Sequence, residues 1–195
     1  MQEPPLGGFV FWESSCLCIR FLFGIVSCMP SRNSIKQYVA GSYYHIYNRG
    51  VERRVVFMDD RDYRTFIGYL KFYLTPPDPW TRAHKDLSQE IELMAYCLMP
   101  NHFHLLVRQV SDRGIESLMR CLMSSYVRYF NRRYKRVGSL FQDSYKAVRI
   151  INDSQLYQVE KYIHLNPESA IADVSRYPYS SLKWGKRRPH WLARV

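Results

Sequence analysis

Two short groups of side chains in this sequence have the types and spacing needed for metal binding and nucleophilic attack. The first is His102-Phe103-His104, in a stretch whose composition favours a β-strand. Because alternate residues of a strand project from the same face, both imidazoles can reach one divalent cation. The HxH pattern alone is weak evidence, since two histidines on a half-buried strand serve a structural role just as readily.

The second group lies near the end of an expected helix, where Tyr162 and Asn166 are one turn apart and share a face. The amide oxygen of Asn166 is a hard ligand that suits Mg²⁺ or Mn²⁺. The phenol of Tyr162 attacks well only as a phenolate and needs a polarised electrophile. The alternative is structural: Tyr162 packs the helix and Asn166 ends it.

The hydrophobic pattern predicts the elements that must bring these groups together. Strands are expected at residues 42–48, 91–98, 102–109 and 143–151, with a tight turn at 99–101. Helices are expected at residues 61–74 and 114–134 and from a cap at 152–154 to about 165. This order predicts an α+β fold, with helices packed on an antiparallel sheet in a ferredoxin-like arrangement. The sequence has neither a GxGxxG nor a GxxxxGK phosphate loop.

The composition is that of a basic globular protein. The 195 residues include 28 Lys and Arg against 17 Asp and Glu, a formal charge of +11, which predicts a polyanionic partner, nucleic acid before an acidic membrane surface. No stretch reaches the roughly 18 uncharged apolar residues of a membrane span, so no membrane association is expected. Five cysteines without a CxxC zinc pattern indicate a reducing cytoplasm.

The positive charge gathers toward the end of the long expected helix and on the strand after it. The candidates for phosphate contacts there are Arg128, Arg132, Arg133, Lys135, Arg136, Lys146 and Arg149. Arg49 and Arg53, after the first strand, are further candidates. Interleaved tyrosines at 126, 129, 134 and 145 are candidates for stacking on bases. The alternative is a solvated helix face with its apolar stripe turned inward.

The first 28 residues differ from the rest of the chain. They are apolar but interrupted by Glu13 and Arg20, and the composition turns basic and polar after Met29. We hypothesise that translation starts at Met29 and that residues 1–28 are an extension outside the fold. The expected organisation is then a single domain at 29–184 followed by a basic tail at 185–195.

Five segments, in order along the chain, resemble the HUH single-tyrosine transposases, especially the REP-associated tyrosine transposases. They are YHIYNRG at 44–50, YCLMPNHFHLLV at 96–107, GSLFQDSYK at 138–146, YIHLNP at 162–167 and YPYSS at 177–181. The resemblance spans roughly residues 29–184, and five ordered matches are far more specific than any one of them.

The resemblance implies an HUH-endonuclease type of fold and a role for each candidate residue. His102 and His104 fall at the metal ligands and Tyr162 at the nucleophile. Asn166 falls at the third ligand, where related transposases can carry Gln. His45, by contrast, is interpreted as a packed strand residue rather than a fourth ligand.

The implied activity is metal-dependent cleavage and strand transfer of single-stranded DNA, that is, DNA transposition, through a 5′-phosphotyrosine intermediate. The implied cofactor is Mg²⁺ or Mn²⁺, with no nucleotide cofactor. The implied partner is a hairpin or palindromic repeat, bound by a monomer or a homodimer. Two alternatives stay open: a non-catalytic module that binds single-stranded nucleic acid, and a rolling-circle-type nicking nuclease.

Overall fold

The part of the chain that the structure describes begins close to the first expected strand. The structure is a computed structural model, and it describes residues 38–77, 85–169 and 173–194. The extension at 1–28 and the hypothesis of a start at Met29 lie outside these residues.

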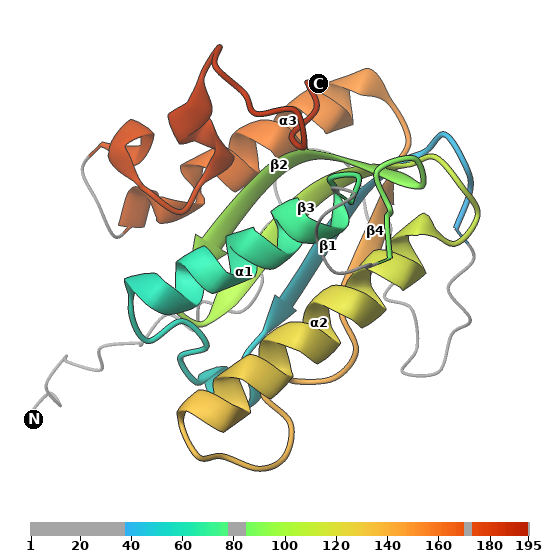
Figure 1. Ribbon diagram of the computed structural model, residues 1–195. Helices are drawn as coiled ribbons and strands as arrows, with labels where there is room; N and C mark the ends of the chain where they lie inside the picture. Colours follow the sequence, from blue (N-terminus) through green and yellow to red (C-terminus); the bar gives the residue numbers. More distant parts are fainter. Residues whose placement is uncertain (1–37, 78–84, 170–172, 195) are drawn as a thin grey trace, which may run out of the picture. The chain divides into compact units, whose positions relative to one another are not determined.

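A four-stranded antiparallel sheet forms the centre of the fold (Figure 1). Its strands are β1 (Tyr43–Arg49), β2 (Ile91–Met99), β3 (His102–Gln109) and β4 (Lys146–Ile150), in the order β2-β3-β1-β4. All neighbouring pairs are antiparallel. The α+β fold with an antiparallel sheet is confirmed, and each strand lies within a few residues of its expected place.

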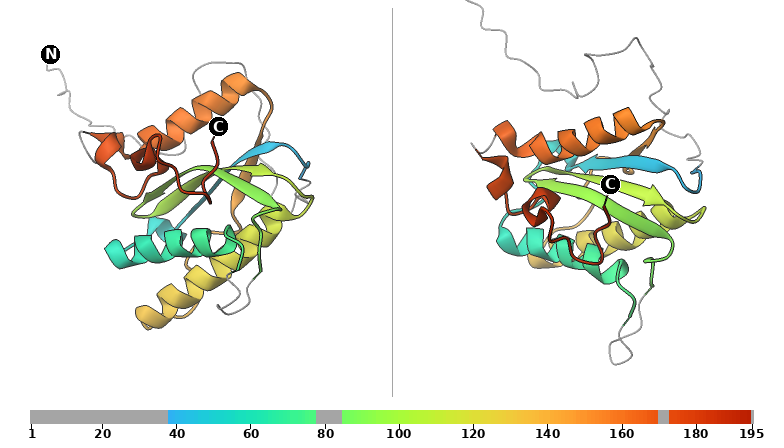
Figure 2. Two further views of the ribbon diagram at one scale, coloured as in Figure 1. Left: turned by 45° about the horizontal axis from the view of Figure 1, so that its top comes forward. Right: turned by 90° about the horizontal axis from the view of Figure 1, so that it is seen from above.

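Three helices cover the two faces of the sheet. The helices α1 (Asp60–Tyr73) and α2 (Gly114–Arg133) lie on one face, and α3 (Asp153–Leu165) lies on the other (Figure 2). The predicted cap of α3 is confirmed, since Asn152 accepts from the backbone N–H of Gln155. Asp59 caps α1 in the same way and accepts from the backbone N–H of Asp62. Over the described ranges, none of the helices has the length and apolarity needed to cross a membrane.

The strand register decides which side chains face which helices. In the β1–β3 pair Tyr47 lies opposite His104, and Ile46 lies opposite Leu105. Because alternate residues point to opposite faces, Ile46 and Leu105 face α1 and α2, whereas Tyr47 and His104 face α3. The sheet therefore has an aromatic and aliphatic face and a second face that carries the histidines.

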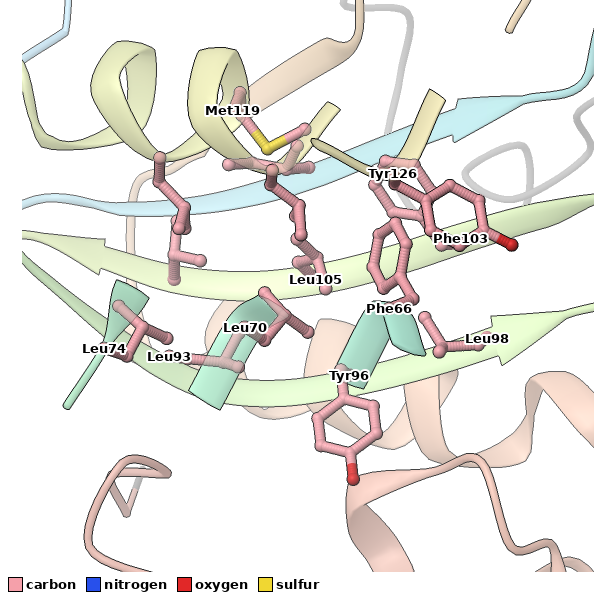
Figure 3. Close-up of a cluster of buried hydrophobic side chains, with 14 of the residues drawn as sticks. Phe66, Leu70, Leu74, Leu93, Tyr96, Leu98, Phe103, Leu105, Met119 and Tyr126 are labelled. Carbon is pink, nitrogen blue, oxygen red and sulfur yellow. The ribbon is translucent and has the colours of Figure 1, made fainter. Parts of the chain in front are cut away.

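The larger core lies between the sheet and the helices α1 and α2 (Figure 3). Phe66 of α1 contacts Tyr126 of α2, with ring centroids 5.0 Å apart, and Phe103 of β3, with centroids 5.2 Å apart. All three side chains are completely buried. Burial of the apolar area of such a stripe contributes several kcal/mol to stability and fixes the two helices against β3.

The C-terminal segment differs from the expected tail at 185–195, because it packs along β2. Trp191 and Leu192 are buried in the larger core, and the backbone N–H of Ala193 donates to the carbonyl of Leu93 over 2.8 Å. Arg188 donates to the carbonyl of Met94 and pairs with Glu160 of α3. Two apolar residues within a basic stretch are enough to attach this segment to the edge of the sheet.

A buried carboxylate joins α1 to the end of α2. The side chain of Asp62 is completely buried and accepts from the backbone N–H of Met58, from Arg133 and from the hydroxyls of Tyr129 and Tyr134. Two of the tyrosines considered for base stacking are therefore used inside the fold. These donors compensate the burial of the carboxylate, and a substitution that removes the carboxylate or one of its donors is expected to destabilise the fold.

We predict that Asp62→Asn destabilises the fold by about 3 kcal/mol, because it removes the charge and turns an amide N–H toward groups that already donate. Urea unfolding measures the change. The control is Asp60→Asn on the same helix, whose exposed pair with Arg64 is worth less than about 1 kcal/mol. Equal losses in the two variants would contradict this role for Asp62.

Candidate active site

The β2–β3 hairpin and the end of α3 bring the four predicted active-site residues together. His102 Nε2 lies 3.2 Å from Asn166 Oδ1. The ring of Tyr162 meets the ring of His104 edge-on, with centroids 5.4 Å apart at 86°. The residues predicted from HxH and from the Tyr–Asn spacing thus form one cluster, on the face of the sheet covered by α3.

His104 lies deepest in this cluster. It is buried, and its Nδ1 is 2.9 Å from Nε2 of His45 on the neighbouring strand. The ring of His45 also lies 6.0 Å from that of Tyr162, centroid to centroid. Burial lowers the pKa of His104 well below its ordinary value, and the nearby imidazoles and the charge of Arg49 lower it further. His104 is therefore a neutral imidazole, the form that binds metal ions.

The hydrogen bonds of His102 define which of its nitrogens carries the proton. Both ring nitrogens face amide oxygens, and the neutral ring has a single proton. The contact to Oδ1 of Asn101 is the shorter one, at 2.7 Å, so we assign the proton to Nδ1. Burial lowers the pKa of His102, although its contact with Asn166 opposes this effect. In the neutral ring the lone pair is then on Nε2, directed at the amide oxygen of Asn166.

This arrangement fits a divalent cation. A lone pair on His102 Nε2 that faces the oxygen of Asn166 is favourable only with a positive group beside both atoms. Two imidazole nitrogens and one amide oxygen suit Mn²⁺ or Mg²⁺. Within the described residues no three His, Cys, Asp or Glu side chains form a metal-binding group, so a cation here depends on Asn166 as the third ligand.

Backbone contacts hold the turn before His102 in place. The backbone N–H groups of Val56 and Phe57 both donate to the carbonyl of Pro100, over 2.8 Å and 3.0 Å. The N–H of Gly50 donates to the carbonyl of Asn101 over 2.8 Å. A Cβ at Gly50 would lie 2.2 Å from the carbonyl oxygen of Arg54, so only glycine fits there. The turn that carries Asn101 is therefore fixed from the side of β1.

Comparisons with known proteins cover the residues of this candidate site. Residues 81–166 match the family model described as "Transposase IS200 like", and this stretch contains His102, His104, Tyr162 and Asn166. Over these residues the chain is similar to IS200-like transposases. The resemblance found in the motifs is confirmed for this family. A search of curated proteins found no match.

The fold of this chain matches a solved structure. A REP-associated tyrosine transposase bound to a REP hairpin is 17% identical, with a TM-score of 0.58, over 84% of this chain and 92% of that one. A putative transposase from Deinococcus radiodurans is 20% identical over 67% of this chain and 95% of that one, with a TM-score of 0.43. The first match shows that this chain has the fold of that REP-associated transposase.

The basic residues considered for DNA contacts separate into three groups. Arg49, Arg53 and Lys146 lie on the side of the protein that carries the candidate active site. Arg49 is paired with His102 in the β1–β3 register, and the carbonyl of Arg53 accepts from Asn101 over 3.4 Å. Lys146 lies opposite Tyr47, and its Nζ is 5.9 Å from the centroid of that ring.

The second group lies on the other side of the sheet. Arg128, Arg132 and Arg133 of α2 line a groove of about 510 Å³ together with Arg61 of α1. Arg133 is paired with Asp59 and Asp62, so its charge is largely compensated. Arg128 and Arg132 are exposed, and no ion pair is found for them among the described residues. The charge cluster predicted from the sequence thus contains both structural and accessible arginines.

The remaining basic candidates lie near the ends of α2 and β4. Lys135 is exposed just beyond α2, and Arg136 donates to Asn131 over 3.3 Å while its guanidinium lies over the ring of Phe130. Arg149 is exposed on β4 opposite Tyr44, which places it on the α1–α2 face.

The metal-free protein is expected to lose stability as the pH falls from 7.5 to 5. Burial lowers the pKa of His45 from 6.5 to about 4, so in this range the unfolded chain takes up a proton that folded His45 does not. That one residue accounts for about 2 kcal/mol by pH 5. Burial lowers the pKa of His102, His104 and His164 as well, which adds in the same direction.

Urea unfolding at pH 7.5, 6.5 and 5 in the presence of a chelator measures this loss. Protonation of the ion-paired carboxylates, whose pKa values lie below 3.8, takes place below this range. His45→Leu is expected to flatten the profile. A wild-type stability that does not change between pH 7.5 and 5 would show that these imidazoles are not buried as described.

Proposed function

We propose that this transposase cleaves and rejoins single-stranded DNA through a covalent bond to Tyr162, with a divalent cation held by His102, His104 and Asn166. The observation that carries the proposal is the meeting of α3 with β3, where the phenol, the amide and two imidazoles lie within one cluster. The two imidazoles are 58 or more positions from Tyr162 and Asn166 in the chain, so their meeting is a property of the fold.

The proposed step exchanges one phosphate ester for another. The phenol oxygen of Tyr162, after loss of its proton, attacks the phosphorus, and the bond from phosphorus to the 3′ oxygen breaks. The products are a 5′-phosphotyrosine and a 3′-hydroxyl, which takes up a proton. A second 3′-hydroxyl can attack the phosphotyrosine in the reverse sense and rejoin strands, so no nucleotide cofactor is needed.

The residues around Tyr162 have separate tasks in this proposal. His102, His104 and Asn166 hold the cation, which when bound stabilises the negative charge that develops on the phosphate. The edge-on contact with His104 holds the phenol ring at the site. Arg49, paired with His102 in the register, adds positive charge beside the phosphate.

The arginine groove supplies the second part of the proposal, which is binding of DNA with a duplex stem. The REP-associated transposase that shares this fold is bound to a REP hairpin. In the present chain Arg61, Arg128 and Arg132 line a groove on the helical face, where successive phosphates of one strand can pair with them. We propose that this groove holds the stem while Tyr162 acts on the single strand.

Incubation with a single-stranded oligonucleotide that carries a hairpin, in the presence of Mn²⁺, tests the catalytic proposal. Wild-type protein is expected to form a covalent adduct that survives denaturing electrophoresis, and Tyr162→Phe is expected to form none while it still binds the DNA. Tyr157→Phe is the matched control, because Tyr157 lies exposed on the same helix and should leave the adduct unchanged.

Three outcomes separate the candidate functions. An adduct that rejoins to an added 3′-hydroxyl supports a strand transferase, and cleavage without rejoining supports a nicking nuclease. Salt-sensitive binding by folded wild-type protein with no adduct on any hairpin tested would support the non-catalytic binding module and contradict the catalytic proposal.

A second measurement tests the arginine groove. We predict that Arg128→Gln with Arg132→Gln weakens hairpin binding about tenfold or more near physiological salt and reduces the salt slope of log K by about 2, because two phosphate contacts are lost. Binding of an oligonucleotide without a stem should change little.

The control for the groove variant removes the same charge from the first half of α2 and its N-cap. Arg113→Gln with Arg120→Gln changes two other exposed arginines at the opposite end of α2. This control is expected to keep hairpin affinity within about threefold. Equal losses in both double variants would mean that only net charge matters and would overturn the groove as a binding surface.

A further inference from the structure

We infer that His45 is a positioning residue: it accepts the Nδ1–H of His104 and so keeps the Nε2 lone pair of His104 available to the cation. The inference rests on the proposed function for the presence of a cation, but the proton arrangement can be measured without one.

The contact between the two rings is a direct hydrogen bond inside the fold. His45 Nε2 and His104 Nδ1 are 2.9 Å apart, and both residues are less than a tenth exposed. The ring planes differ by 25° and the centroids are 5.0 Å apart, which fits an end-to-end contact through these nitrogens. The register makes the contact possible, because His45 and His104 project from neighbouring strands on the same face.

Counting protons on the pair leaves two arrangements. Each neutral imidazole carries one proton, so one of the facing nitrogens donates and the other accepts. If His45 donates, the proton of His104 must lie on Nε2, and His104 then has no lone pair left for a metal ion. If His104 donates from Nδ1, its Nε2 is free to bind, and His45 carries its own proton on Nδ1. Only the second arrangement is compatible with His104 as a ligand.

His102, the neighbouring proposed ligand, also has a hydrogen-bond acceptor at its Nδ1. His102 donates from Nδ1 to the oxygen of Asn101 over 2.7 Å, and an amide oxygen can only accept. Asn101 therefore fixes the tautomer of His102, as metal-binding histidines generally require of a second hydrogen-bonding partner. His45 stands in the corresponding place for His104, so the two ligands have one acceptor each.

Packing alone does not account for an imidazole at this position. The residue paired with His45 on β3 is Leu106, which is completely buried in the smaller core. A second aliphatic side chain would fill this part of the sheet without the cost of burying a polar ring. The burial of His45 is offset by its bond to His104, which indicates a role in orienting that ring.

Nitrogen-15 NMR of the full metal-free chain, labelled in its histidine rings, tests the proton arrangement directly. Two-bond correlations report which ring nitrogen is protonated. We expect His104 to be protonated on Nδ1 in the wild type, and His45→Leu to raise the fraction protonated on Nε2. A wild-type His104 protonated mainly on Nε2 would overturn the inference.

Binding of Mn²⁺ to the same variants is the second readout. We expect His45→Leu to bind Mn²⁺ about 10- to 100-fold more weakly, with a similar loss for Asn101→Leu. His45→Gln supplies an amide oxygen that can accept from Nδ1, so it should restore affinity to within about threefold of wild type. His190→Leu, an exposed histidine near the C-terminus, controls for the number of imidazoles and should bind as wild type does.

The outcomes separate this inference from the proposed function. Wild-type affinity in a folded His45→Leu, or equal losses in the Leu and Gln variants, would overturn the positioning role. A wild-type protein that binds no Mn²⁺ would count against the proposed function, while the NMR result on the metal-free chain would still decide the role of His45. If His45→Leu does not fold, the wild-type spectrum and His45→Gln decide it instead.

Discussion

The pairing of β1 with β3 is the constraint on which the rest of the structure depends. Its register sets His104 opposite Tyr47 and leaves Phe103 and Leu105 on the other face. A slip by one residue would turn both imidazoles into the aromatic core and expose that core to α3. The same alternation therefore defines the larger core and the active site, so neither can be changed without the other. The glycine at position 50, where no Cβ fits, holds the end of β1 against the hairpin turn.

The active site is a polar patch within a small hydrophobic core. Met94, Cys97, Leu106 and Ile163 lie in the cluster between the sheet and α3, on the face that the histidines share. Burial there disfavours protonated imidazole, which keeps the proposed ligands in the form that binds a cation. The same low polarity strengthens the attraction between a bound cation and a phosphate. The buried imidazoles are therefore neutral at pH 7. At low pH, where the unfolded chain takes up protons that these imidazoles do not, the metal-free protein loses stability.

Local patterns predict the elements and make the four central residues candidates, and the family resemblance assigns those residues their roles. Neither identifies their partners. The HxH spacing and the turn before it place two imidazoles on one face of a strand, and the four-residue spacing places Tyr162 and Asn166 on one face of a helix. His45 was expected to pack as a strand residue, and its bond to His104 depends on a strand pairing that periodicity does not specify. The burial of Trp191 was missed for a similar reason, because a basic stretch has no helical or strand pattern to reveal a long-range contact.

Basic residues that lie close together in the sequence have different roles in the folded protein. Arg128, Arg132 and Arg133 are close in the chain, yet Arg133 is held by two carboxylates while the other two remain accessible. Arg49 lies beside the histidines, with the whole sheet between it and the groove. A nucleic acid that contacts both the groove and Tyr162 has to pass around the sheet, which a rigid duplex of a few base pairs does not do. A molecule with a duplex stem and a flexible single strand meets this requirement, so the two faces together favour a hairpin over either form alone.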